Sequence, residues 1–366
     1  MKKGYYIHFQ VRESIGVSKK IDMQLAEFQK YYDVTELEIK SVKRNLFQRI
    51  IGLVPTASIK RKYEEAFENI ENPDFIYARR TVADREYVSF WKSVKRKFPN
   101  CKIIIEIFTY PYDKDDFGKW NAWPFYFKEK LYRRYLKKYI DRFVTYTDDK
   151  EIFGVKTICT TNGIDCDAVK LVEGDYQERR MNMLGVAYMQ RQHGYERVIK
   201  GLARYYQDKN RDYKVTLQLV GDGPEKKYYE ELVDQYGLRD YVEFYKTICG
   251  NELDSMYDRA DVALAAFGMY KVKFSGAIGA LKTRECLAKG LPLISGSPID
   301  VLEPEFKYAK IFPNNSTIID INVVVDFFEH IKDKKTKHEV AEDIRNRAEK
   351  KISMHVVMNP IIEFIN

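Results

Sequence analysis

Runs of consecutive apolar residues, typical of strands buried on both faces, alternate with longer stretches of helical periodicity. In the first half, strands are predicted at Tyr5–Phe9, Val34–Ile39, Asp74–Ala78, Lys102–Ile107, Arg142–Thr147 and Lys156–Thr160. Helices are predicted at Ser18–Tyr31, Ile59–Ile70, Asp84–Lys97 and Phe125–Tyr139. This alternation predicts an α/β fold, with a parallel sheet covered by helices on both faces.

The second half repeats the alternation after a turn at Thr161–Asp165 (TNGID). Its strands are predicted at Asn182–Tyr188, Val215–Val220, Val242–Tyr245, Val262–Ala266, Pro292–Ser295 and Lys310–Phe312. Its helices are predicted at Tyr195–Tyr206, Glu225–Tyr236, Asn251–Asp258, Leu281–Lys289, Ile321–Ile331 and Lys337–Lys350. A chain of 366 residues suits two domains, and we place them at residues 1–168 and 169–351, with a hinge near 161–172.

One stretch of the second half, Phe274–Pro298, carries the clearest candidate chemistry. Gly279 lets the backbone approach a ligand closely, and a helix is expected to begin near Ala280. The free N–H groups of a first helical turn suit a phosphate. Lys282 in that turn is well placed for a diphosphate, and Glu285 follows about one turn later.

A structural interpretation of the same residues stays open. Glu285 and Lys289 have the spacing of an exposed i,i+4 ion pair. Lys282 could equally be a solvated surface lysine.

Composition narrows the class of protein. Hydrophobic residues make up 45% of the chain and aromatic residues 14%, which excludes a disordered chain. The five cysteines are scattered without metal-ligand or redox spacing, so a reduced, cytoplasmic compartment fits best. The N-terminal residues read as a strand rather than a signal segment, and no apolar run approaches the roughly 18 residues of a spanning helix.

The two halves of the chain differ in net charge. Residues 1–170 hold 33 Lys and Arg against 24 Asp and Glu, whereas residues 171–366 hold 29 against 30. Two runs in the basic half, Ser41–Lys62 and Phe125–Phe143, mix basic with apolar or aromatic residues, as helices on an anionic membrane do. The alternative is a surface helix that buries its aromatic face and shows its lysines to water. No nucleic-acid-binding signature accompanies the basic residues.

Four further motifs frame the stretch Phe274–Pro298. They are Gly185–Ile199 (GVAYMQRQHGYERVI), Val215–Pro224 (VTLQLVGDGP), Asp240–Tyr245 (DYVEFY) and Arg259–Ala266 (RADVALAA). In this order, after TNGID, they resemble the nucleotide-sugar domain of retaining glycosyltransferases with the GT-B fold. The phrases Ile105–Asp115 and Val144–Asp165 are similar to the acceptor domain of bacterial family 4 (glycosyl transferases group 1) enzymes of polysaccharide biosynthesis.

The resemblance implies two doubly wound Rossmann-like domains that face an interdomain cleft, with a C-terminal helix at 352–366 crossing back to the first. It assigns the ribose hydroxyls of the donor nucleotide to Glu285, because a carboxylate can accept two hydrogen bonds. It assigns the diphosphate to the loop and helix start within Phe274–Pro298. It assigns the edge of the nucleotide pocket to the turn after Val215–Val220, and the base to the end of the strand Val242–Tyr245. The residues concerned are Gly279, Ala280, Leu281 and Lys282, then Gly221, Gly223 and Phe244.

The chain departs from the family pattern at several positions. The family's earlier glutamate falls on Ala277, and its basic loop residues fall on Tyr188 and His193, with Arg191 between them to supply charge. His193 either contacts phosphate or is a capping or surface histidine.

Three candidates lie on the acceptor side. Gly16, in the loop after the first strand, could let backbone N–H groups meet an anion. Thr109 and Tyr110 stand where the family often has a histidine.

The expected activity is transfer of a sugar, with retention, from a nucleoside-diphosphate sugar, by family frequency a UDP-sugar. The expected acceptor is a hydroxyl of a lipid-linked or oligosaccharide acceptor in bacterial surface polysaccharide synthesis. We expect a peripheral protein on the inner face of the plasma membrane that needs no metal or other cofactor. No catalytic base can be named from the sequence.

Two other functions are compatible with an α/β chain of this kind to different degrees. An inactive GT-B module that scaffolds an active partner is the alternative, and donor hydrolysis by the pure protein would distinguish it. A dehydrogenase fits poorly, because Lys226 takes the place of the third glycine of the dinucleotide fingerprint.

Overall fold

The computed structural model describes residues 1–9, 15–42, 45, 54, 57, 61–113, 122–208 and 211–366. The chain forms two compact units. Unit 1 comprises Met1–Thr161 and Met354–Asn366, and unit 2 comprises Asn162–Ser353. Within the described ranges, no helix has both the length and the apolar character that crossing a bilayer requires.

Unit 1 is built on a sheet with the strand order β2-β1-β3-β4-β5-β7-β6. All neighbours are parallel except β6 and β7, which form an antiparallel pair. The strands are β1 (Lys3–His8), β2 (Asp33–Glu38), β3 (Phe75–Arg79), β4 (Lys102–Ile107), β5 (Arg142–Thr145), β6 (Glu151–Ile152) and β7 (Val155–Cys159).

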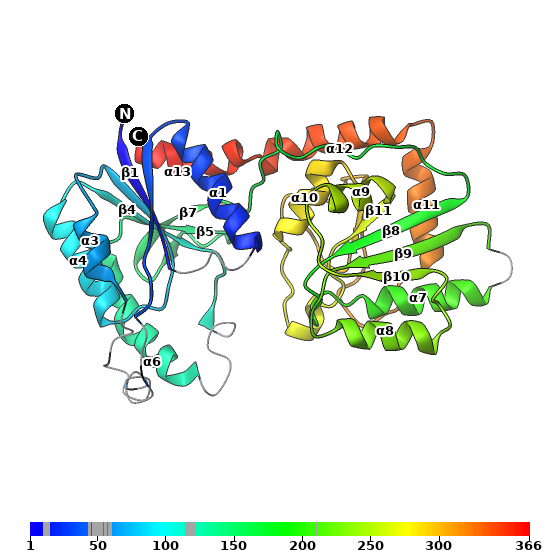
Figure 1. Ribbon diagram of the computed structural model, residues 1–366, viewed down its shortest axis with the longest axis horizontal. Helices are drawn as coiled ribbons and strands as arrows, with labels where there is room; N and C mark the ends of the chain where they lie inside the picture. Colours follow the sequence, from blue (N-terminus) through cyan, green and yellow to red (C-terminus); the bar gives the residue numbers. More distant parts are fainter. Residues whose placement is uncertain are drawn as a thin grey trace. The chain divides into compact units, whose positions relative to one another are not determined.

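Helices cover both faces of this sheet (Figure 1). They are α1 (Ile15–Gln29), α3 (Tyr63–Glu68), α4 (Arg85–Lys97), α6 (Trp123–Tyr132), the 3-10 helix η2 (Arg133–Lys138) and α13 (Met354–Ile365). Apolar residues of α1 and α13 pack on one face, against Tyr6 and Tyr77, and those of α3 and α4 pack on the other, against Ile7 and Ile103. The sheet is therefore buried on both sides, as its apolar runs require.

The last helix, α13, is tied to unit 1 by polar contacts as well as by its apolar face. The Lys2 ammonium donates to the carbonyl of Ile365 at 2.7 Å, and Lys102 donates to that of Phe364 at 2.7 Å. These lysines satisfy carbonyl groups that a helix leaves open at its C-terminus.

Unit 2 is a parallel sheet with the order β10-β9-β8-β11-β12-β13. Its strands are β8 (Arg180–Val186), β9 (Lys214–Val220), β10 (Val242–Tyr245), β11 (Val262–Leu264), β12 (Leu293–Ser295) and β13 (Ala309–Ile311). Its helices are α7 (Glu196–Gln207), α8 (Lys226–Gln235), α9 (Asn251–Arg259), η3 (Met269–Val272), α10 (Leu281–Lys289), α11 (Ile321–Lys332) and α12 (Lys337–Ile352). Figure 1 shows α7 and α8 on one side of the sheet and α9 and α10 on the other.

The boundary between the units falls at the start of the expected hinge near 161–172. Unit 2 begins at Asn162 rather than after residue 168, because residues 162–168 are held by unit 2. Ile164 bridges to Ser353, and the Arg345 guanidinium donates to the carbonyl of Cys166 at 2.8 Å. The turn sequence TNGID thus spans the boundary, with Thr161 in unit 1 and Asn162 as the first residue of unit 2.

Two predicted helices are also corrected. The run predicted as one helix, Phe125–Tyr139, divides into α6 and the tighter helix η2. The helix predicted at Ile59–Ile70 is only Tyr63–Glu68, and residues 58–60 lie outside the described part of the chain.

Candidate functional site

The sheet of unit 2 contains one topological switch point. From β8 the chain proceeds outward through β9 and β10, and then returns to place β11 on the other side of β8. In open α/β sheets, ligands bind beyond the carboxyl ends of the strands at such a point. The loops after β8 and β11 are therefore the first place to look for a site.

Backbone hydrogen bonds join these two loops. The Phe267 N–H donates to the carbonyl of His193 at 2.8 Å, and the Gly268 N–H donates to that of Gln192 at 3.0 Å. Gly194 has φ +62, and a Cβ there would lie 2.4 Å from the nitrogen of Gly268. The close approach of the two backbones thus requires glycine, and it fixes the relative positions of the loops.

The turn after β9 packs closely against the backbone of the loop after β8. Gly221 and Gly223 both have positive φ, at 124 and 138. A Cβ on Gly221 would lie 2.1 Å from the Ala187 carbonyl oxygen, and one on Gly223 would lie 2.3 Å from that of Met189. Both glycines are therefore needed for packing against backbone, and contact with a nucleotide stays a prediction for them.

The start of α10 is open to a ligand in the way a phosphate site requires. Ala280 is the N-cap, and its side chain makes no capping hydrogen bond. The Thr283 hydroxyl donates back to the carbonyl of Ala280 at 2.7 Å, so it does not cap the N–H groups either. The N–H groups of Leu281 and Lys282 have no acceptor within the helix, because the first turn offers none. The preceding Gly279 is held through its carbonyl, which accepts from the Asn162 amide at 2.6 Å.

A buried arginine anchors this helix start. Arg284 is fully buried, and one terminal nitrogen of its guanidinium lies 2.6 Å from each carboxylate oxygen of Asp300. Its Nε donates to the carbonyl of Asn162 at 2.8 Å. These contacts hold the loop at Gly279 and the first turn of α10 in one position.

Lys282 is not a solvated lysine. Its ammonium lies 3.5 Å from the carbonyl oxygen of Ala265 and 5.7 Å from the ring centroid of Tyr195. Burial lowers the pKa of Lys282 to about 7. The surface-lysine alternative is therefore wrong, and the lysine lies beside the end of β11 with only part of its charge at neutral pH.

Glu285 does not form the i,i+4 pair with Lys289. The Lys289 ammonium is buried and lies 2.6 Å from a carboxylate oxygen of Asp254 in α9. Glu285 is half-buried, and the buried Tyr257 hydroxyl of α9 lies beside its carboxylate, which helps to raise the pKa of that tyrosine after the effect of burial. The carboxylate makes no ion pair with a described residue, and one hydroxyl neighbour leaves it further lone pairs. A carboxylate in this state can accept two hydrogen bonds from a ligand.

The loop after β8 offers one cation. His193 accepts the N–H of Gln190 at its Nδ1 (2.9 Å), and burial lowers its pKa to about 3. It is therefore neutral at physiological pH, and only its Nε2–H can donate to a ligand. Arg191 is exposed, and its guanidinium makes no hydrogen bond or ion pair to any described residue. Tyr188, in place of the family's basic residue, is 64% exposed.

The remaining predicted residues are distributed as follows. The Phe244 side chain packs at the edge of the core of unit 2, which leaves the backbone of this strand end for a base. Ala277 is exposed beside the start of α10. In unit 1, Thr109 is exposed beyond the end of β4, and Tyr110 contacts the rings of Tyr112 and Phe153.

Gly16 is corrected. It lies exposed in the first turn of α1 rather than in a loop, and a Cβ there would meet no atom within 4 Å. Its conformation does not require glycine. Residues 12–14 of the predicted loop lie outside the described part of the chain.

A buried ionic cluster in unit 1 was missed by the sequence analysis. Glu106 at the end of β4 is fully buried, and its carboxylate is 2.8 Å from the Lys20 ammonium and 2.9 Å from the Arg79 guanidinium. The Tyr146 hydroxyl and the Gln24 amide also donate to it. The only signal in the sequence was a glutamate inside the apolar run Lys102–Ile107.

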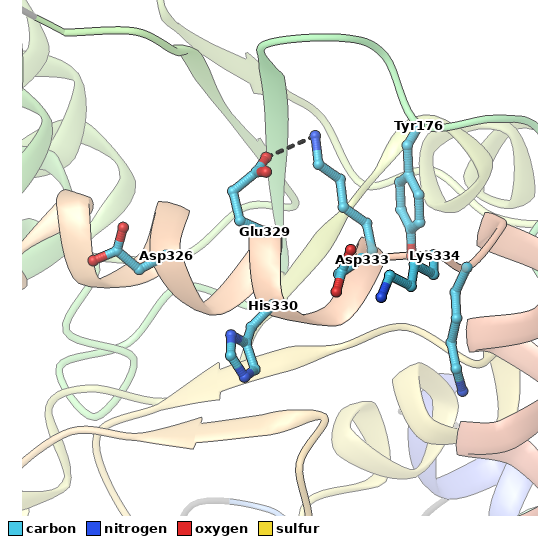
Figure 2. A pocket seen from close by; sticks show the side chains of 8 residues that line it. Tyr176, Asp326, Glu329, His330, Asp333 and Lys334 are labelled. Carbon is cyan, nitrogen blue, oxygen red and sulfur yellow. Dashed lines mark ion pairs between the residues drawn. The ribbon is translucent and has the colours of Figure 1, made fainter.

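A surface pocket of unit 2 lies away from the switch point (Figure 2). It is lined by the end of α11 and the following residues, with Tyr176, and it contains the Glu329–Lys332 ion pair. Lys332 also donates to the hydroxyl of Tyr213, just before β9, so the pocket lies at the amino ends of the strands. Its side chains carry both signs of charge and present no arrangement that selects a ligand.

Metal-ligating side chains do not gather in the described ranges. These ranges contain no group of three or more His, Cys, Asp or Glu side chains that could hold a metal ion.

The chain is similar to one protein family and to several solved structures. Residues 176–351 match the model of the family described as Glycosyl transferases group 1. A glycosyltransferase from Rickettsia africae is similar over 100% of this chain and 97% of its own, with 12% identity and a TM-score of 0.59. Sucrose-phosphate synthase from Thermosynechococcus elongatus is similar over 100% and 98%, with 14% identity and a TM-score of 0.61. The HepE protein of Anabaena in complex with UDP-glucose is similar over 99% of each chain, with 12% identity and a TM-score of 0.62. No curated protein matches the sequence.

The similarity to solved structures establishes the fold. The chain has the two-unit α/β architecture of GT-B glycosyltransferases. Residues 176–351, most of unit 2, are similar to the glycosyl transferases group 1 family.

Proposed function

We propose that the enzyme transfers a sugar from a UDP-sugar, with retention at the anomeric carbon, to a hydroxyl of a lipid-linked saccharide in bacterial surface polysaccharide synthesis. The observation that carries the proposal is the constellation at the switch point of unit 2. There, α10 combines an N-terminus without a side-chain cap, the partly buried Lys282 and the carboxylate of Glu285, which makes no ion pair with a described residue. The choice of uridine is supported by the UDP-glucose of the HepE structure.

The diphosphate is the leaving group in such a transfer, and its growing charge needs stabilisation. The N–H groups of Leu281 and Lys282 and the positive end of the α10 dipole suit this charge. Binding of an anion favours the protonated form of Lys282, whose burial then strengthens the interaction. Arg191 supplies a further cation from the loop after β8. We propose that these groups do the work without a metal ion.

Glu285 is the proposed ligand of the ribose. It lies one turn into α10, so a nucleotide whose diphosphate meets the helix start would bring its sugar toward this carboxylate. The two ribose hydroxyls would then donate to the two carboxylate oxygens. Backbone groups near Phe244, Gly221 and Gly223 are the proposed neighbours of the base.

The charge of unit 1 supports the proposed acceptor and location. Most of its sequence lies in the half of the chain with the excess of basic residues, which suits the surface of an anionic membrane and an acceptor anchored in it. Gly16, Thr109 and Tyr110 remain the proposed acceptor-side residues.

Calorimetry with UDP, GDP and ADP tests the donor site. We expect UDP to bind best, and Glu285→Ala to weaken its binding by about 1.5–3 kcal/mol, the range for a hydrogen bond to a charged group. The control is Glu230→Ala, which removes another half-buried helical glutamate, from α8. UDP that lacks its ribose hydroxyls should bind wild type and Glu285→Ala equally. The proposal fails if none of the nucleotides binds, or if both glutamate variants behave alike.

A further inference from the structure

The burial pattern of α6 is the reverse of that of an ordinary surface helix. Its two central charged residues are inside, with Lys128 0% and Glu129 1% exposed. Its aromatic residues Trp123 and Phe127 are outside, 55% and 48% exposed. Because an amphipathic helix normally shows its charges to water and buries its aromatic face, this arrangement needs a cause and a consequence.

The cause is that both charges are satisfied within unit 1. The Lys128 ammonium donates to the carbonyls of Val54, at 2.7 Å, and Ala57. The Glu129 carboxylate accepts from the Tyr112 hydroxyl at 2.6 Å and from the Ala83 N–H at 2.5 Å. These bonds fix the rotation of the helix, and that rotation turns the aromatic residues outward. The alternative of an aromatic face buried in the core is thereby wrong for Trp123 and Phe127.

The exposed residues form one continuous strip. Trp123 and Phe127 are one turn apart with ring centroids at 5.7 Å, and Lys130 and Arg134 continue the line at the next two turns. Lys137 and Lys138 extend it along η2. Every exposed ionisable side chain from Trp123 to Tyr139 is basic or a tyrosine. The strip is therefore aromatic at one end and cationic at the other.

We infer that this strip, Trp123, Phe127, Lys130 and Arg134, is the element by which the protein inserts into an anionic lipid surface. Tryptophan and phenylalanine favour the boundary between headgroups and acyl chains, and lysine and arginine reach the lipid phosphates beside it. Charge complementarity selects an anionic bilayer as the occupant. The inference rests on the proposed membrane location, and it specifies the contact as aromatic insertion rather than charge attraction alone.

Co-sedimentation with vesicles tests it on the full chain. The vesicles are pure phosphatidylcholine, or equal parts of phosphatidylcholine and phosphatidylglycerol. Wild type should bind the anionic vesicles, and Trp123→Ala/Phe127→Ala should bind them at least about tenfold less at any salt, the effect of losing two buried apolar side chains. Lys130→Glu/Arg134→Glu should reduce binding at low salt in particular.

The matched controls are on unit 2. Tyr228→Ala/Tyr236→Ala removes two other exposed aromatic residues, and Lys227→Glu/Lys350→Glu reverses two exposed charges. Both should bind vesicles as wild type does. Quenching of tryptophan emission by brominated lipid should also occur in wild type and fall in Trp123→Phe, which keeps an aromatic ring and hence most of the binding.

The outcomes separate the proposals. If wild type binds neither vesicle, both this inference and the membrane location fall, whereas the donor site is judged by calorimetry alone. If wild type binds but the aromatic variant binds equally, only the inference falls. It also falls if the aromatic variant has a lower melting temperature but binds vesicles as wild type does. In that case Trp123 and Phe127 stabilise the folded chain rather than contact lipid. A lipid-free dimer of wild type that the aromatic variant abolishes would assign the strip to a second copy.

Discussion

Each unit has a glutamate near the carboxyl ends of its parallel strands, but the two carboxylates differ in their partners. In unit 1, Glu106 at the carboxyl end of β4 is enclosed by Lys20, Arg79, Tyr146 and Gln24. In unit 2, Glu285 beyond the carboxyl end of β11 makes no ion pair with a described residue, and the Tyr257 hydroxyl lies beside its carboxylate. The first carboxylate is enclosed by two cations and two neutral donors, whereas the second is without a cation and keeps lone pairs for a ligand.

The difference teaches how to separate structural from binding charges at a strand edge. Burial alone would raise the pKa of Glu106, but Lys20, Arg79 and the Tyr146 hydroxyl hold it down to about 2. Such a network is costly to break but offers nothing to a substrate. A half-buried carboxylate whose expected partner, Lys289, is bound elsewhere is the opposite case. The predictions below test whether this distinction holds.

The largest expected effect is on stability and comes from Glu106→Ala. Removing the carboxylate leaves the buried cations Lys20 and Arg79 together without their counter-ion. The free energy of unfolding of unit 1 should fall by roughly 3–5 kcal/mol, the usual result of breaking a buried ion pair from one side. Urea unfolding followed by tryptophan emission measures it, because Trp91 lies in the core of unit 1.

The matched variant is Glu285→Ala, which should change the free energy of unfolding by no more than about 0.5 kcal/mol. Equal losses in the two variants would mean that Glu285 has a structural role. A loss of under 1 kcal/mol in Glu106→Ala would mean that water reaches the cluster in unit 1.

Sequence reasoning reached the elements more easily than the contacts. Lys102–Ile107, Val242–Tyr245 and Leu281–Lys289 have the predicted bounds, because an apolar run or a glycine stop determines them locally. The rotation of α6 could not be predicted, since it depends on Val54, Ala57, Ala83 and Tyr112 far away in the chain. Periodicity shows that a helix has two faces, but not which face finds partners.

The candidate site shows the same limit. The motif spacing predicted that Lys282 and Glu285 lie on one short helix, and they do. It could not show that Asp254 takes Lys289, or that burial lowers the pKa of Lys282 to about 7. Both depend on α9 and β11 packing beside α10, which is a tertiary effect.

The next effect is the pH dependence of nucleotide binding. The free Lys282 has a pKa of about 7, and a bound diphosphate must raise it. Binding above pH 7 then takes up a proton, so the affinity for UDP should fall by up to about tenfold per pH unit between pH 7.5 and 9. UDP keeps its own charge over this range, and calorimetry in buffers of different ionisation enthalpy measures the proton uptake directly.

Lys282→Gln should flatten the profile, and Lys226→Gln should keep it. Lys226 also stands in a first helical turn of unit 2, but its ammonium lies 3.3 Å from Asp222. A profile that stays steep in Lys282→Gln would assign the proton to another group. Lys282 would then not be the cation that binds the diphosphate at this edge of unit 2.

The smallest effect is expected from Arg191→Ala. Arg191 is exposed in the loop after β8, whereas Arg79 of unit 1 is buried against Glu106. An exposed cation contributes roughly 0.2–1 kcal/mol to an ion pair, so the affinity for UDP should fall less than about sixfold. The loss should shrink as salt is added, because exposed charges are screened over about 8 Å at physiological ionic strength. The melting temperature should stay that of wild type, whereas Arg79→Ala should lower it without changing UDP affinity in the protein that remains folded. If Arg191→Ala instead destabilises the chain and leaves UDP binding unchanged, Arg191 is a structural residue, and an unpartnered charge at this edge no longer identifies the donor site.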